Sequence, residues 1–124
     1  MTAALDPEGT VPRRLLPDPL GGALMAKFFR ALGDPTRLGL VAFCATQERS
    51  GTDCVTRAGL SQGRVSAHLG CLVSCGLLTL RRQGRFAYYR VTDPRVLELL
   101  QLSQEVAVDH ATAIAACTRV GPAR

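Results

Sequence analysis

Two cysteines, Cys71 and Cys75, stand four residues apart in the stretch "SAHLGCLVSCGLL", in which the spacing of apolar residues is typical of a helix. Residues four apart on a helix lie on adjacent turns, with Cβ atoms about 5–6 Å apart. Two thiolates placed in this way can bind one ion at sulfur–metal distances of about 2.3 Å. Because all-sulfur coordination favours soft ions, the pair predicts a site for Cd²⁺, Pb²⁺ or Hg²⁺, with Zn²⁺ less favoured.

The other cysteines have more ordinary interpretations. The chain has five cysteines and no export signal at its N-terminus, so we expect a cytoplasmic protein with reduced or metal-bound thiols. Cys44 and Cys54 are expected in the core, although Cys54 could add a sulfur ligand. Cys117 fits a ligand or a filler in an alanine-rich helix equally well. His110, seven residues earlier, could be an extra ligand, although a solvent-facing or interface position is favoured.

A segment whose charged residues are all basic indicates the class of partner. The segment from Cys54 to Thr92 contains no Asp or Glu, and its six arginines are Arg57, Arg64, Arg81, Arg82, Arg85 and Arg90. Such a block predicts a polyanionic partner, and the alternative is a solvated basic face. No apolar stretch is long enough for a membrane span. We expect no enzyme and no small-molecule substrate, because no carboxylate near His68 could orient a Cys–His pair.

Turn and cap signals divide the 124 residues into elements. Four prolines predict a flexible arm over residues 1–19, followed by one domain over residues 20–120. Helices are expected over residues 20–32, from Pro35 after the N-cap Asp34, over residues 52–58, from the N-cap Ser61 to Cys75, and from Pro94 to Thr118. A β-hairpin is expected around Gln83 and Gly84, because two β-prone runs flank them.

This order of elements is typical of a winged helix-turn-helix, a mainly α fold with a small β-hairpin. In such a fold the second helix of the motif enters the major groove, and the hairpin touches the neighbouring backbone or minor groove. Gln62 and Arg64 are the predicted base readers. The full set of predicted DNA contacts is Ser61, Gln62, Gly63, Arg64, Ser66 and His68 on the helix, with Arg81, Arg82 and Arg85 on the hairpin. His68 could instead pack within its motif, and each hairpin arginine could be a solvated residue that blocks strand pairing.

Three stretches carry a resemblance to a known family. "FFRALGDPTRLGLV", "GLSQGRVSAHLGCL" and "GLLTLRRQGRFAYYRV" cover most of residues 28–91 and resemble the ArsR/SmtB family of metal-sensing transcriptional repressors. The resemblance implies a homodimer, joined through its first and last helices, that binds double-stranded operator DNA when metal-free and dissociates when metal binds. The last helix is also too apolar for the surface of a monomer, with Val96, Leu99, Leu100, Leu102, Val106, Val108 and Ile114.

Within that family the chain resembles the cadmium- and lead-sensing branch. This resemblance implies a metal site of Cys71, Cys75 and Cys117, with Cys117 from the same or the other subunit. The zinc site of the last helix looks absent, because only Asp109 and His110 match it, and the arsenic-type Cys-x-Cys is reduced to Cys54. The alternatives are a thiol-based redox sensor on the same scaffold and a purely architectural DNA binder.

Overall fold

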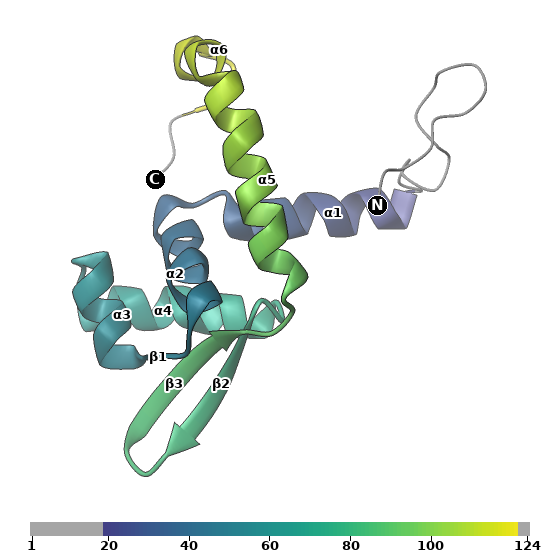
Figure 1. The fold of residues 1–124 in the computed structure, drawn as a ribbon. Coiled ribbons are helices and arrows are strands. Elements are labelled where there is room, and N and C mark those ends of the chain that lie inside the picture. Colours follow the sequence, from purple (N-terminus) through teal and green to yellow (C-terminus); the bar gives the residue numbers. More distant parts are fainter. Residues whose placement is uncertain (1–18, 122–124) are drawn as a thin grey trace. The chain divides into compact units, whose positions relative to one another are not determined.

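The computed structural model describes residues 19–121, and its contacts divide the chain into two units, residues 1–30 and 31–124 (Figure 1). The predicted arm lies outside the described residues except for Pro19, which begins helix α1 (Pro19–Leu32). In the first unit, α1 exposes large apolar side chains: Leu24, Met25 and Phe29 are each about half exposed or more. The remaining helices and strands all belong to the second unit.

The second unit has the predicted order of a winged helix-turn-helix. Its elements are α2 (Pro35–Thr46), β1 (Arg49–Ser50), α3 (Gly51–Ala58), α4 (Gln62–Ser74), β2 (Leu78–Gln83), β3 (Phe86–Val91), α5 (Arg95–Asp109) and α6 (Ala111–Ala116). Helices α3 and α4 form the helix-turn-helix, and β2 and β3 form the wing, which projects away from the helices (Figure 1). None of the described helices is long and apolar enough to cross a bilayer.

Local caps set the ends of α2, α3 and α4. The Asp34 carboxylate accepts a hydrogen bond from the Arg37 backbone N–H at 2.9 Å, and the Ser61 hydroxyl accepts one from the Arg64 N–H at 3.3 Å. Gly59 follows α3 with φ 67°, a left-handed conformation that glycine adopts without strain. Gly59 and the N-cap Ser61 together hold α3 and α4 only a few residues apart.

The core lies between α2, α3, α4 and the base of the hairpin. Val65, Leu69 and Leu72 on α4 are at most 2% exposed and form its inner face. On α2, Leu40 and Cys44 are buried, whereas Leu38 is 41% exposed. The other buried side chains of this core are Val41, Cys54, Leu77, Leu78 and Val96.

Two features of the second unit were not predicted. Strand β1 pairs with β3, which makes a three-stranded antiparallel sheet in the order β1-β3-β2. The helix expected over residues 94–118 is interrupted at His110, whose φ of −114° and ψ of 19° separate α5 from α6. Every residue from 101 to 121 is exposed, so no packing among the residues that the structure describes holds the helix straight through that point.

Candidate nucleic-acid interface and thiol site

The first half of α4 presents polar residues to solvent. Val65 and Leu69 anchor the helix in the core, which turns the opposite side outward. Five of the predicted DNA contacts are exposed there: Ser61, Gln62, Gly63, Arg64 and Ser66. Apart from Gln62 and Arg64, these residues have short side chains or none, so this surface can approach a DNA groove closely.

A cleft of about 410 Å³ separates α4 from the wing. Gln62 and Ser66 line it from α4, and Arg82 and Arg85 line it from the wing. Its remaining walls are the start of α3, the inner side of the sheet and apolar side chains of the motif: Ser50, Gly51, Thr52, Val55, Val65, Leu69, Phe86, Ala87 and Tyr89. No acidic side chain is among them. The structure therefore brings four of the predicted DNA contacts together around one concave basic surface.

Arg81 lies on the other face of the hairpin from Arg82. Successive side chains of a strand point to opposite faces, and Arg82 faces the cleft. The Arg81 guanidinium donates hydrogen bonds to both carboxylate oxygens of Glu48, at 2.7 and 3.1 Å, and one to Gln83 Oε1 at 2.8 Å. It also lies 4.5 Å from the centre of the Tyr88 ring. Arg81 thus connects the wing to the segment before β1 and is separated from the other predicted wing contacts.

His68 is also separated from the exposed residues of α4. Its side chain is 22% exposed, and Nδ1 lies 4.0 Å from Oδ2 of Asp34, the N-cap of α2. Of the two interpretations of His68, packing within the motif agrees better with this position than a phosphate contact. The expectation that no carboxylate lies near His68 is therefore wrong, because Asp34 precedes the acid-free segment in sequence but lies beside His68 in the fold.

Cys71 and Cys75 lie at the end of α4. The Cys75 backbone N–H donates to the Cys71 carbonyl oxygen at 3.0 Å, so the two residues are one helical turn apart, as predicted. Cys71 is partly buried and Cys75 is exposed. Both thiols therefore differ from those of the core, and an ion in solution can approach them.

Cys117 follows α6, at the end of α5 that is remote from α4 (Figure 1). It is exposed, and hydrogen bonds from the backbone N–H groups of Val120 and Arg119 lower the pKa of its thiol. Within residues 19–121 of one chain, no three His, Cys, Asp or Glu side chains converge as a metal site. A single chain thus places Cys71 and Cys75 together but leaves Cys117 and His110 apart from them.

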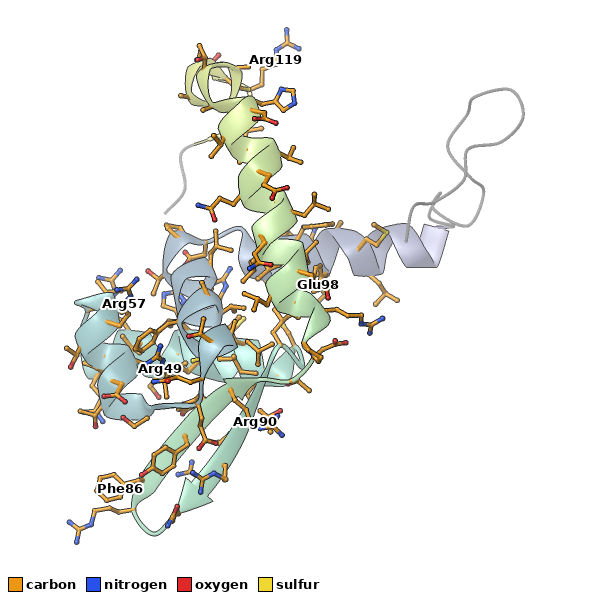
Figure 2. All side chains as sticks on the ribbon, in the orientation of Figure 1. Arg49, Arg57, Phe86, Arg90, Glu98 and Arg119 are labelled. Atoms are coloured by element: carbon orange, nitrogen blue, oxygen red, sulfur yellow. The ribbon has the colours of Figure 1, made fainter. Side chains whose placement is uncertain are left out.

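Cys44 and Cys54 form a separate, buried pair between α2 and α3. They are 2% and 0% exposed, which confirms the expected core positions. A hydrogen bond with Cys54 and burial raise the pKa of the Cys44 thiol, which therefore stays protonated. The Arg49 side chain lies over this region, with its guanidinium 4.0 Å from the centre of the Phe43 ring (Figure 2).

Sequence reasoning missed several residues of the cleft. Thr52 lies on the first turn of α3, a helix on which no DNA contact was predicted. Phe86 lies at the hairpin tip and points outward, with 54% of its side chain exposed (Figure 2). Its signal was its place two residues after the Gln83–Gly84 turn, where an aromatic residue cannot reach a core.

Comparison with known proteins agrees with this geometry. Residues 34–79 match the family model "Bacterial regulatory protein, arsR family". A probable mercury resistance operon repressor from Streptomyces lividans is 52% identical over 95 residues, which are 77% of this chain and 76% of the relative. A transcriptional repressor SmtB homolog from Synechocystis sp. is 42% identical over 86 residues, 69% of this chain and 62% of that protein.

A solved structure supports the fold. The homodimeric winged helix-turn-helix DNA-binding domain of Mb0332 from Mycobacterium bovis is 34% identical, with a TM-score of 0.65 over 72% of this chain and 82% of that domain. The predicted fold class is confirmed by this likeness and by the order of the elements. The chain therefore belongs to the arsR family of bacterial regulatory proteins, and it is a winged helix-turn-helix transcriptional regulator rather than an enzyme.

Proposed function

We propose that the chain is a cytoplasmic repressor that binds operator DNA as a homodimer and releases it on binding a thiophilic metal ion. The exposed polar start of α4 enters the major groove, with Gln62 and Arg64 reading base edges. Ser61, Gly63 and Ser66 approach the backbone beside them. Arg82 and Arg85 bind phosphate or the minor groove from the wing, whereas Arg81 and His68 serve mainly the protein itself, through Glu48 and Asp34.

The dimer forms through exposed apolar side chains. Helices α5 and α6 expose Leu102, Val106, Val108 and Ile114, each more than half accessible, and α1 exposes Leu24 and Phe29. Apolar area of this kind on both helices predicted as the interface supports a second copy as the occupant. The homodimeric domain from Mycobacterium bovis supports the same assembly.

The metal site consists of Cys71 and Cys75 with Cys117 of the partner subunit. The single observation that carries this proposal is the accessible one-turn spacing of Cys71 and Cys75 at the end of the DNA-binding helix. The lowered pKa of Cys117 supports its use as a thiolate ligand. No third donor joins the pair within the described part of one chain, which supports the partner subunit as the source of the third sulfur.

Three thiolates suit a soft ion such as Cd²⁺, Pb²⁺ or Hg²⁺ better than Zn²⁺. Among these, the name of the Streptomyces relative adds weight to mercury. Cys54 is a core residue and does not belong to the site. His110 stands seven residues before Cys117 and outside any donor cluster of a single chain.

Release of DNA follows because the metal ion and the DNA bind the same rigid helix, α4. Arg64 and Cys71 are seven residues apart, about 10 Å along the helix axis. Drawing the last turn of α4 toward Cys117 of the partner subunit tilts the first half of α4 out of the groove. A coupling free energy of about 1–3 kcal/mol between the two ligands is typical of such linkage.

A redox sensor is the second candidate. The lowered pKa and exposure of Cys117 favour reaction of its thiolate with peroxide. Titrating DNA binding with Hg²⁺ or Cd²⁺ under reducing conditions, and with peroxide in the absence of metal, separates the two functions.

The test is an ultraviolet titration of the full chain with Cd²⁺, Pb²⁺, Hg²⁺ and Zn²⁺, run in parallel with binding to a duplex that the chain selects from a random-sequence library. We expect sulfur–metal charge-transfer absorption near stoichiometric addition and a concurrent loss of DNA affinity. DNA release without such absorption, or release by peroxide alone, would refute the metal proposal.

A further inference from the structure

We propose that the cleft between α3, α4 and the wing seats one stretch of the sugar–phosphate backbone, with Arg82 and Thr52 binding phosphate and Phe86 packing against deoxyribose. This inference rests on the proposed DNA-binding function. It adds Thr52 and Phe86 to the DNA interface. It also assigns Arg82, and not its neighbour Arg81, to the contact with DNA.

The alternation of major and minor grooves along DNA places the sugar–phosphate backbone at the cleft. When α4 lies in a major groove and the wing tip in the adjacent minor groove, one strand's backbone must run between the two elements. The cleft is the space between those elements, since Gln62 and Ser66 form one wall and Arg82 and Arg85 form the other. A volume of about 410 Å³ can hold a phosphate with parts of its two sugars.

The lining has the chemistry of a phosphate seat. Phosphate contacts come mainly from arginine, hydroxyl and amide side chains, and they fix the register of a protein on DNA without reading sequence. The cleft offers Arg82, Arg85, Thr52, Ser66 and Gln62, and no carboxylate among its lining residues repels an anion. No ion pair within residues 19–121 engages Arg82 or Arg85.

Phe86 completes the rim with an apolar surface. It pairs with Gln83 at the hairpin tip, on the sheet face that carries Arg81, but there it still lines the rim of the cleft and is 54% exposed (Figure 2). A deoxyribose ring is the apolar part of the backbone that would reach this position once Arg82 holds the phosphate. The ring then loses exposed apolar area on DNA binding.

The salt dependence of binding separates the two kinds of contact. Each phosphate neutralised by a side chain adds about 0.9 to the slope of log K against log salt. In a homodimer, Arg82→Gln therefore lowers the slope by about 1.8. Phe86→Ala lowers affinity about three- to tenfold through lost apolar contact and leaves the slope unchanged. Thr52→Val weakens binding equally on specific and unrelated duplexes, because backbone contacts carry no sequence information.

Arg90→Gln is the matched control. It removes the same charge from the same hairpin, but Arg90 pairs with Thr79 on the face that carries Arg81, away from the cleft. The full-length variants are measured against a duplex selected by the wild-type chain and against an unrelated duplex, over a series of salt concentrations. Thermal unfolding of each variant confirms that it is folded.

The outcomes are distinct. The proposal predicts a reduced slope for Arg82→Gln alone, and a loss of affinity without a change of slope for Phe86→Ala. Equal slopes for Arg82→Gln and Arg90→Gln, with wild-type DNA binding intact, would overturn the cleft while leaving the proposed function standing. A wild-type chain that selects no duplex from a random-sequence library would overturn both.

Discussion

The backbone N–H of Cys75 donates a hydrogen bond to the carbonyl oxygen of Cys71 at 3.0 Å, which places the two thiols one turn apart at the end of α4. The same helix begins with the exposed residues proposed to read DNA. One rigid element therefore carries both functions, and changes at one end are expected to affect the other.

The first prediction concerns the thiol pair itself. Cys71→Ser and Cys75→Ser each remove one of the proposed sulfur ligands, so metal-induced release of DNA should be lost while metal-free DNA affinity stays within about threefold. The measurement is DNA binding by fluorescence anisotropy with and without Hg²⁺ or Cd²⁺. Ser74→Ala, an exposed change between the two cysteines, should respond as the wild type does. Full metal response in Cys71→Ser would contradict the proposed ligand set.

A second prediction distinguishes the buried pair from the ligands. Cys54 is 0% exposed, so Cys54→Ser places a hydroxyl in the core and should lower the free energy of unfolding by about 1–3 kcal/mol. Metal-induced release should persist in the folded variant, because Cys54 is not among the proposed ligands. Urea unfolding measures the first effect and DNA binding the second. A Cys54→Ser variant that is fully stable but unresponsive to metal would make Cys54 a ligand.

The third prediction is a difference in pH dependence among thiols. Backbone N–H groups lower the pKa of Cys117, so its alkylation should begin at lower pH than in a peptide of residues 111–121. The raised pKa and burial of Cys44 should leave it unreactive until the chain unfolds. Mass spectrometry of iodoacetamide-treated protein over a pH series gives both rates.

The sign of the linked stability follows from the same shift. The folded pKa of Cys117 is below its unfolded value, so its thiolate stabilises the fold at pH above the unfolded pKa. That contribution falls as pH drops through the folded pKa. An alkylation midpoint for Cys117 at or above that of the peptide would contradict the assignment.

A fourth prediction concerns assembly. Leu102 and Val106 lie one turn apart on α5 and are 58% and 52% exposed. Replacing both with Glu should convert the dimer to a monomer and weaken DNA binding steeply, because two half-sites no longer bind together. Gln104→Glu, on the polar side of α5, should leave the dimer intact. Analytical ultracentrifugation measures the assembly, and a wild-type chain that sediments as a monomer at micromolar concentration would refute the interface.

Much of the winged helix-turn-helix could be predicted from local signals. Asp34, Ser61 and Gly59 fix helix ends through short-range hydrogen bonds or backbone conformation, so their effect is visible in sequence. The thiol spacing of Cys71 and Cys75 follows in the same way from helical geometry.

Other features depend on long-range packing and could not be predicted. Strand β1 has only two residues, Arg49 and Ser50, too few to show an alternating pattern, and it forms because β3 offers a free edge. The break at His110 lies in an exposed segment without a glycine or proline signal. That Arg81 and Arg82 lie on opposite faces of the hairpin could be predicted, since neighbouring side chains alternate along a strand. That Arg81 binds Glu48 could not, because Glu48 lies 33 positions earlier in the chain.

The central claim is that metal and DNA compete through α4, and reciprocal linkage tests it most directly. The affinity for Hg²⁺ or Cd²⁺ is measured by competition with a chelator, once for the free dimer and once for the dimer saturated with its selected duplex. We predict that DNA weakens metal binding by about 5- to 150-fold, and by the same factor by which metal weakens DNA binding. Equal metal affinity in the two states would contradict the account.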